Sequence, residues 1–325
     1  MILLFAMGCH MTIDFVVHQA IHCSNVGTET CEGEEEYWDK SCLPCEEPYD
    51  WNREYNWFAQ TLEEGETLRE FDVELIENIR LLTKDEQSEL DLFYIPSHGE
   101  NPKTVDTLLL YNHGNKIGIE HYIPRIRYLY QAGYNILTWD YRGYGKAGNA
   151  ELSDPTVVTT PEQWFEDTIQ VLEYAMILAE DPNKIVTYAN SVGSIPAVEQ
   201  ILTDLPCAYI QEAGFLSIRQ NAIMGTTVAL PGGFLSQGLF ENDIKIQEYD
   251  GPVFVMSGTV DDRNSIEEVR DFYELIRGPK DLWELEGVNH GIKTIGVPEA
   301  GVTEYLAKME EFLQAKAPGC LTLAE

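Results

Sequence analysis

The sequence predicts an α/β fold: a mostly parallel central sheet with helices on both faces and two antiparallel strands at its N-terminal side. The first observation behind this prediction is that short, continuous apolar runs alternate with longer amphipathic stretches from residue 105 onward. Such runs are typical of strands buried on both faces, and strands that alternate with helices build parallel sheets. The second observation is that residues 71–82 and 89–96 partly alternate apolar and polar side chains, as half-buried antiparallel strands do.

The buried strands are expected where β-branched, aromatic and aliphatic residues follow one another with little interruption. These runs are residues 105–111, 134–139, 185–188, 208–212, 252–257 and 282–285. Between them the sequence predicts helices at residues 119–131, from the turn at 191 to about 202, at 265–276 and at 302–313.

One further helix is expected to begin at Pro161, because proline is favoured in the first turn of a helix. Helical spacing then places five apolar side chains on one stripe, which we expect to face the sheet. They are Phe165, Ile169, Leu172, Met176 and Ala179.

The chain has 325 residues and a formal net charge of −34, with 55 acidic and 21 basic side chains. This charge disfavours binding to nucleic acid, whose phosphates it would repel, and docking on anionic lipid head groups. We therefore expect neither as a partner. The sequence contains no apolar run long enough for a membrane-spanning helix, which needs about 20 residues.

Residues 1–67 differ from the rest and are expected to form an acidic, loop-rich leader, followed by one α/β domain at residues 68–318. Between Cys31 and Asp72 there are 14 acidic and 3 basic residues. The aromatic side chains of this part either form a ligand platform or, as we favour, pack the leader onto its host. They are Trp38, Trp51, Tyr55, Trp57 and Phe58.

The start of the chain resembles the end of a bacterial lipoprotein signal, because a short apolar stretch leads to Gly8 and Cys9. It departs from that pattern in lacking a basic region before the apolar stretch. A lipid on Cys9 would tether the exported protein to a membrane, whereas an ordinary apolar terminus is compatible with a cytoplasmic protein. We take export as the expectation.

The leader contains four more cysteines, which are expected to form two disulfides in an oxidising compartment. They are Cys23, Cys31, Cys42 and Cys45. The close pair Cys42 and Cys45 is alternatively half of a zinc site, but no second close-spaced pair completes it, and we predict no metal. Cys207 and Cys320 form either a further disulfide or two buried free thiols.

Residues 184–202 carry the most informative local pattern of the chain. An apolar strand turns abruptly into a helix around Ser191, with the small residues Ala189 and Gly193 two positions before and after it. A nucleophile elbow needs small residues there, because its strained turn brings the strand and helix backbones close together. The turn exposes the serine hydroxyl at the carboxyl end of a strand. Alone, the pattern is a weak signal, and an ordinary strand-to-helix turn that contains serine explains it better.

Other residues capable of chemistry follow the ends of the other expected strands. In a parallel sheet these ends meet at one edge, where ligands and reactive groups gather. The residues are His113, Gly114 and Asn115 after the strand at 105–111, Asp140 after 134–139, Asp261 and Asp262 after 252–257, and His290 after 282–285.

Together these segments resemble the α/β-hydrolase superfamily, in particular its compact serine hydrolases without a large cap domain, which include esterases, lipases and acyl-protein thioesterases. The order of serine, acid and histidine along the chain agrees with that superfamily. Two departures are Ala189, in place of the usual first glycine, and Val192 after the serine. The matching motifs lie between residues 70 and 315: Leu-Tyr-Asn-His113-Gly-Asn, Trp-Asp140-Tyr-Arg-Gly-Tyr-Gly, the turn at Ser191, Gln211-Glu-Ala-Gly-Phe-Leu-Ser-Ile218, Gly-Thr-Val-Asp261 and Gly-Val-Asn-His290-Gly.

The resemblance implies that Ser191 is a nucleophile, that His290 is the base that removes its proton, and that Asp261 orients the imidazole. Serine needs such a base because its hydroxyl is a weak nucleophile on its own. The backbone N–H groups of Asn115 and Val192 are expected to form the oxyanion hole, which stabilises the negative oxygen of the transition state.

Three neighbouring residues are expected to support this site. Gly114 lets its loop approach the substrate closely, and Gly193 allows the close packing of the elbow. His113 stands where the family usually supports the oxyanion loop, although it is also a candidate for a second base.

Two acids leave alternatives open. Asp262 can replace Asp261 because the two are adjacent, although the register of the Gly-Thr-Val-Asp motif favours Asp261. The segment from Asp140 to Arg142 is expected to hold loops by hydrogen bonds rather than to take part in chemistry.

The sequence therefore predicts a serine hydrolase that cleaves carboxylic esters or thioesters through an acyl-enzyme intermediate and needs no cofactor. Its substrate is expected to be a small-molecule or lipid acyl ester or thioester. The alternatives are a serine peptidase and an exported binding lipoprotein that lost catalysis. Residues 215–248 form either a small lid or acyl-binding wall, or core packing above the sheet. The oligomeric state stays open.

Overall fold

The computed structural model describes residues 49–52, 67–115, 118–147, 159–179, 181–203, 205–217, 240–290 and 302–322. The expected lipid at Cys9 and the expected pairing of the other leader cysteines lie outside these residues, as do four of the five leader aromatic residues and most of the segment 215–248.

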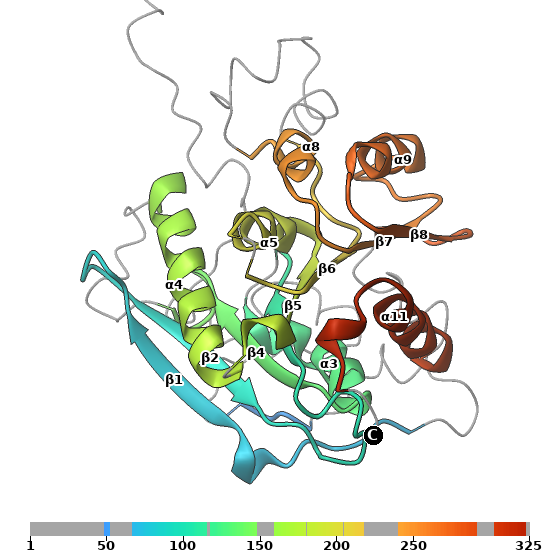
Figure 1. Cartoon of the computed structure of the whole chain (residues 1–325). Helices are drawn as coiled ribbons and strands as arrows, with labels where there is room; N and C mark the ends of the chain where they lie inside the picture. Colours follow the sequence, from blue (N-terminus) through green and yellow to red (C-terminus); the bar gives the residue numbers. More distant parts are fainter. Residues whose placement is uncertain are drawn as a thin grey trace, which may run out of the picture.

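One eight-stranded sheet forms the centre of the described chain (Figure 1). The pairs β1–β2 and β2–β4 are antiparallel and all other pairs are parallel, which confirms the predicted fold class. In spatial order the strands are β1 (Glu77–Leu82), β2 (Glu89–Ile95), β4 (Asn135–Asp140), β3 (Leu108–Asn112), β5 (Ile185–Asn190), β6 (Ala208–Glu212), β7 (Val253–Gly258) and β8 (Lys280–Leu285).

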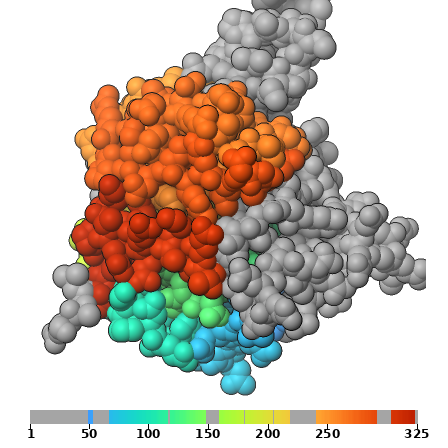
Figure 2. Space-filling model, turned by 90° about the vertical axis from the view of Figure 1, so that its right-hand side faces the viewer, coloured from blue at the N-terminus to red at the C-terminus, as the bar shows by residue number. Residues whose placement is uncertain are grey.

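Helices cover both faces of the sheet, as the alternation of strands and helices predicts. One face carries α3 (Ile119–Gln131) and α11 (Val302–Lys316), and the other carries α4 (Pro161–Ala179), α5 (Ser194–Ile201) and α9 (Ile266–Leu275) (Figure 1). In Figure 2 helix α11, in red, lies at the surface between the orange segment 240–290 and the teal and blue N-terminal part. The remaining elements are the short helix α8 (Asn242–Lys245) and the 3₁₀ turns Val73–Leu75, Pro182–Lys184, Ser191–Gly193, Ile246–Glu248 and Pro318–Cys320.

The four central parallel strands are buried along their whole length, which explains why their sequences are continuously apolar. Successive side chains point to opposite faces: Leu110 packs in the cluster under α4 and α5, whereas Tyr111 packs in the cluster under α3 and α11. Strand β1 stands at one edge, and all six of its residues are exposed or half-buried. None of the described helices is long and apolar enough to cross a membrane.

The buried stripe of α4 differs from the predicted one by about one position along the helix. Trp164, Val171, Leu172 and Ala175 are buried, whereas most of the expected stripe is only half-buried. On the buried face Trp164 packs against Tyr141, with ring centroids 5.3 Å apart. The spacing of apolar residues could not predict this buried face, because the face also includes the polar residues Asp167 and Thr168.

The described end of the leader packs onto the core. Trp51 contacts Phe71 and Phe93, with ring centroids 5.7 and 5.1 Å apart, and its exposed fraction is 3%. The expectation that leader aromatic residues pack on their host is confirmed for Trp51. The domain boundary at residues 67/68 stays a prediction.

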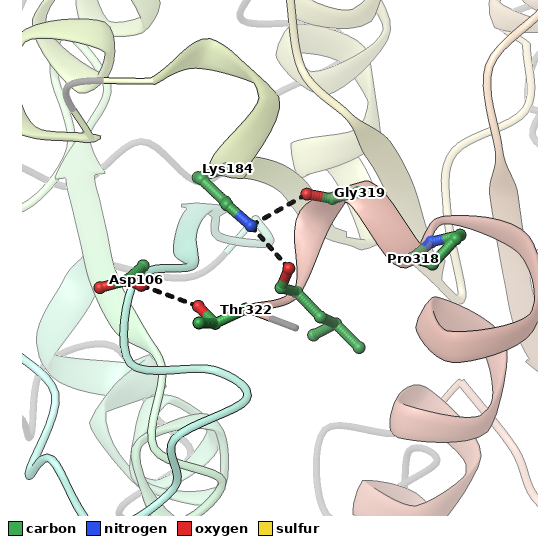
Figure 3. Close-up of a pocket in the computed structure, with 6 residues that line it drawn as sticks. Asp106, Lys184, Pro318, Gly319 and Thr322 are labelled. Carbon is green, nitrogen blue, oxygen red and sulfur yellow. Dashed lines mark hydrogen bonds between the residues drawn. The ribbon is translucent and has the colours of Figure 1, made fainter. Parts of the chain in front are cut away.

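The C-terminal segment, residues 317–322, lies against the edge of the sheet where the parallel strands begin. A surface pocket of about 400 Å³ lies between this segment, Asp106 and Lys184 (Figure 3). Lys184 donates to the carbonyl oxygens of Gly319 (3.1 Å) and Leu321 (2.6 Å), and Thr322 donates to Asp106 (2.8 Å). These polar contacts fasten the segment to the sheet.

A disulfide between Cys207 and Cys320 also holds this segment, which settles the alternative between a disulfide and two free thiols. The two residues are 113 positions apart, so the bond closes a long loop. Cross-linking a loop of that length restricts the unfolded chain strongly.

Replacing Cys320 or Cys207 with serine is expected to lower the free energy of unfolding by about 3–5 kcal/mol, because the loop-closure constraint on the unfolded chain is lost. The double variant should be no less stable than either single one, since all three lack the same bond. Urea denaturation measures the effect, with Thr322→Val as a control that loosens the segment without touching the disulfide. If the serine variants are as stable as the wild type, the disulfide does not stabilise the fold and the prediction is wrong.

Candidate active site

The elbow at Ser191 has the geometry that its small neighbours predict. Strand β5 continues two residues further than expected, to Asn190, and Ser191 then takes a φ of 52°, a left-handed conformation that is strained for serine. A Cβ atom on Gly193 would lie 2.2 Å from the carbonyl oxygen of Asn112, so only glycine fits there. Ala189 is fully buried in the strand.

Ser191, His290 and Asp261 are joined by a continuous chain of hydrogen bonds. The hydroxyl Oγ of Ser191 lies 3.0 Å from Nε2 of His290, and Nδ1 of the same imidazole lies 2.8 Å from Oδ2 of Asp261. A carboxylate only accepts, so Nδ1 carries a proton and donates it, which leaves Nε2 free to accept from the serine. The structure thus brings together the three residues that the sequence singled out.

Asp261 rather than Asp262 faces the imidazole. Its side chain is fully buried, and its other oxygen accepts hydrogen bonds from the backbone N–H groups of Arg263 (2.7 Å) and Asn264 (3.0 Å). The side chain of Asp262 is 61% exposed and lies near Arg263. Two fixed donors orient the Asp261 carboxylate, and the carboxylate in turn orients the imidazole.

The loops that carry Asp261 and His290 are bonded to each other, which sets the distance between the two side chains. The N–H of Val260 donates to the carbonyl of Val288 (3.1 Å), and the N–H of Thr259 donates to Leu285 (2.9 Å). A Cβ atom on Gly258 would lie 2.0 Å from the Val288 carbonyl oxygen. The glycine of the Gly-Thr-Val-Asp motif is therefore required for the close approach of the two loops.

The expected oxyanion loop, residues 113–115, follows β3 at the same edge of the sheet. Gly114 fits tightly, because a Cβ atom there would lie 2.5 Å from the hydroxyl oxygen of Tyr122. His113 is fully buried; its Nδ1 lies 2.7 Å from the Gly114 carbonyl and its Nε2 lies 3.4 Å from Asp140. Because a carbonyl only accepts, Nδ1 is a donor within the loop.

Asp140 and Arg142 hold neighbouring elements together, as the sequence predicts. Asp140 accepts a hydrogen bond of 2.7 Å from the N–H of Ile119 at the start of α3. Arg142 donates to the carboxylates of Asp85 (2.8 and 2.9 Å) and Asp167 (2.5 and 2.8 Å). These contacts bind α3 and α4 to the end of β4.

Sequence reasoning missed a buried polar cluster that joins α3 and α11 to the sheet beside the elbow. Arg125 donates to Glu212 (2.7 Å), and Tyr188 donates to the other Glu212 oxygen (2.6 Å) while its hydroxyl also contacts that of Tyr305. Glu212 pairs with Asn190 across β5 and β6, next to Ser191. The detectable signal was a carboxylate at the end of the apolar run 208–212.

A second buried carboxylate, Asp91, lies in β2 opposite Asp140 of β4. One oxygen accepts from Asn78 (2.6 Å) and lies 3.3 Å from Arg80, but the other has no hydrogen-bond partner among the described residues. Burial, and then the charge of Asp140, raise the pKa of Asp91 to about 6. Its charged form is therefore less stable in the folded protein than in the unfolded chain, whose Asp titrates near 3.8.

Replacing Asp91 with asparagine is expected to remove part of the pH dependence of stability. In the wild type the contribution of Asp91 to stability falls as pH rises from 3.8 to 6, because the folded state holds the proton of this carboxyl more tightly than the unfolded chain does. The stability of Asp91→Asn relative to the wild type should rise by about 2 kcal/mol between pH 4.5 and pH 7.5 in urea denaturation. Asp262→Asn, at an exposed carboxylate, is the control. A stability difference between Asp91→Asn and the wild type that does not change with pH would contradict the prediction.

Within the part of the chain that the structure describes, no group of three or more His, Cys, Asp or Glu side chains is arranged to hold a metal ion.

Comparison with known proteins identifies relatives of low sequence identity. No family model matches the chain. The uncharacterized protein YfhR of Salmonella typhimurium is 24% identical over 217 residues, which are 63% of this chain and 70% of that protein. Alpha/beta hydrolase domain-containing protein 17C of Homo sapiens is 24% identical over 214 residues, which are 65% of this chain and 59% of that protein.

Solved structures share the fold over about three quarters of the chain. The esterase Pf2001 of Pyrococcus furiosus has a TM-score of 0.55 at 20% identity and covers 74% of this chain and 93% of its own. Est1E of Butyrivibrio proteoclasticus, solved with ferulic acid, has a TM-score of 0.57 at 18% identity and covers 73% and 99%. The acylaminoacyl peptidase of Pyrococcus horikoshii has a TM-score of 0.58 at 17% identity and covers 82% and 44%. At these identities the likeness concerns the fold alone.

Proposed function

Because this chain is a member of the α/β-hydrolase superfamily, we propose that it is a serine hydrolase that cleaves carboxylic esters or thioesters through an acyl-enzyme intermediate. The observation that carries the proposal is the hydrogen-bond chain from Ser191 through His290 to Asp261 at the carboxyl edge of the sheet. The esterase activity named for Pf2001, and the carboxylic acid (ferulic acid) bound to Est1E, support the same reaction class.

The first half of the reaction begins at the 3.0 Å contact between Ser191 and His290. Nε2 of His290 takes the hydroxyl proton while Oγ of Ser191 attacks the carbonyl carbon of the substrate. The carbonyl oxygen becomes negative, and the backbone N–H groups of Val192 and Asn115 stabilise it. The tetrahedral intermediate collapses, the bond to the alcohol or thiol breaks, and His290 returns the proton to the leaving group.

In the second half, water attacks the acyl-enzyme. His290 takes a proton from the water, the new oxyanion forms at the same two N–H groups, and the carboxylic acid leaves as Ser191 recovers its proton. Asp261 stabilises the imidazolium ion in both halves. The buried Asp261 side chain, fixed by the two backbone donors after it, suits this task because it needs no rearrangement during the reaction.

The proposed reaction is tested by measuring the hydrolysis of p-nitrophenyl acyl esters and labelling by a fluorophosphonate, in the wild type and in Ser191→Ala. An acyl-chain-length series and a panel of thioesters then define the acyl group. Peptide substrates belong in the same panel, because the same arrangement cleaves amides and a peptidase shares this fold. If the wild type hydrolyses peptides but no ester, the protein is a peptidase and the esterase proposal is wrong. If it reacts with no substrate and is not labelled, the result favours a binding protein without catalysis.

We also propose that the protein works in an oxidising compartment. The disulfide between Cys207 and Cys320 supports this, since such bonds persist where thiols are not kept reduced. Alkylation of native protein without reductant tests it. Free thiols at all four of Cys23, Cys31, Cys42 and Cys45 would argue against export.

A further inference from the structure

Three tyrosines surround the loop of residues 113–115. Tyr122 comes from α3, whereas Tyr141 and Tyr144 come from the segment that follows β4. All three side chains are buried, with exposed fractions of 4% or less. The acyl-enzyme chemistry proposed above does not itself use any of them.

The ring of His113 is packed among these tyrosines. It stacks on Tyr141, with ring centroids 4.2 Å apart and an angle of 19° between the planes, and on Tyr122 at 5.2 Å and 29°. Tyr144 meets the same ring with its edge, at 5.4 Å and 64°. Such contacts restrict the rotation of the imidazole and hold the start of the loop.

Two tyrosine hydroxyls donate directly to the loop. Tyr141 donates to the carbonyl oxygen of His113 (2.7 Å), and Tyr144 donates to the side-chain oxygen Oδ1 of Asn115 (2.5 Å). Burial raises the pKa of the Tyr141 hydroxyl well above its ordinary value, so it stays a donor at any working pH. The loop is therefore bonded at both its first and its last residue.

The hydrogen bond to the Asn115 side chain is relevant because the backbone N–H of Asn115 is expected to be one of the two oxyanion donors. Among the described residues, no backbone carbonyl accepts a hydrogen bond from the N–H of Asn115, the group that the proposed mechanism assigns to the oxyanion. An oxyanion donor accelerates the reaction only if it is already in place before charge develops. Residues outside helices and strands lack a regular hydrogen-bond pattern that would hold the N–H in that direction.

We propose that Tyr144 is a positioning residue, whose hydroxyl holds the Asn115 side chain and thereby aims the Asn115 N–H at the substrate oxyanion. This inference rests on the proposed function and adds a residue to it. Gly114 completes the arrangement, because the missing Cβ lets the loop press against Tyr122.

The chain offers a matched control for this contact. Tyr94 also donates its hydroxyl to the Oδ1 of an asparagine, Asn135, at 3.2 Å. Asn135 begins β4, at the edge of the sheet opposite Ser191. Tyr94→Phe therefore removes the same chemical group from the same kind of acceptor, away from the site.

The test compares four variants with the wild type on a p-nitrophenyl ester: Tyr144→Phe, Asn115→Ala, the double variant and Tyr94→Phe. Asn115→Ala keeps the backbone N–H but removes the acceptor of the tyrosine hydroxyl. We expect Tyr144→Phe and Asn115→Ala each to lower kcat by about 10- to 100-fold, with KM changed less than about twofold. The double variant should be no slower than the slower single one, because both act through one contact.

Two further readouts separate positioning from a loss of structure. The pH profile of kcat should keep its shape in Tyr144→Phe, since His290 and Asp261 are untouched, and the melting temperature should match that of Tyr94→Phe. Affinity for a boronic acid, which imitates the tetrahedral intermediate, should fall by the same factor as kcat.

Distinct results overturn each proposal. If the wild type is active and Tyr144→Phe equals Tyr94→Phe, or if the losses in the double variant multiply, the positioning role is wrong and the proposed function stands. If the wild type and Ser191→Ala are indistinguishable on every substrate, the proposed function fails and the positioning role fails with it.

Discussion

Replacing Ser191 with alanine is expected to lower kcat for a p-nitrophenyl acyl ester by about 10⁴-fold or more and to abolish labelling by a fluorophosphonate. The substitution removes the attacking oxygen, so any remaining hydrolysis needs direct attack by water. What activity is left would come from substrate binding and the oxyanion donors. The fold should survive, because alanine takes the left-handed backbone of Ser191 with a strain similar to that of serine.

Steady-state kinetics and in-gel fluorescence of the labelled protein measure this result. Ser97→Ala is a suitable control, because Ser97 donates to the Gly133 carbonyl at 2.6 Å, outside the hydrogen-bond chain of the proposed site, and is not activated by a histidine. It should keep both activity and labelling. Undiminished labelling of Ser191→Ala would place the nucleophile elsewhere and refute the mechanism.

Replacing Asp261 with asparagine is expected to lower kcat by about 10⁴-fold while leaving the fold intact. The asparagine oxygen would stay with its two backbone donors, the N–H groups of Arg263 and Asn264. Its NH₂ group would then face Nδ1 of His290 and donate to it. The imidazole would carry its proton on Nε2 instead and could no longer accept the proton of Ser191.

Asp262→Asn is the matched control for this variant, since it makes the same chemical change one residue further along at an exposed side chain. Its kcat should lie within about twofold of the wild type, and both variants should unfold at similar urea concentrations. The opposite ranking of the two variants would assign the acid to Asp262 and contradict the geometry of the loop.

The alternation of apolar runs with amphipathic stretches was enough to predict the fold class, and helix α3 and strand β6 have the predicted bounds. Strands were the easier elements, because burial on both faces leaves an uninterrupted apolar signal. Helix α4 shows that apolar spacing alone does not predict which face of a helix is buried. Its buried face includes Asp167, which is tolerated there because Arg142 pairs with it, and a partner 25 residues away in the chain leaves no trace in helical spacing.

The site shows the same division. The need for glycine at positions 114 and 193 was predicted from the sequence, and in the structure a Cβ atom at either position would collide with a neighbouring backbone or side chain. The role of the tyrosines around residues 113–115 could not be predicted from the sequence. An aromatic residue after a strand is most often simply core, and only the packed structure shows that its hydroxyl meets Asn115.

The sequence alone determined the type and order of the elements, the α/β-hydrolase resemblance and the residues worth testing, since these depend on local composition and on spacing along the chain. Only the tertiary structure decided that Asp261 rather than Asp262 faces His290, and that Ser191 and His290, 99 residues apart, lie 3.0 Å from each other. The reason is physical: a distance of a few ångströms between remote residues depends on how strands and loops pack, and packing is a property of the whole fold.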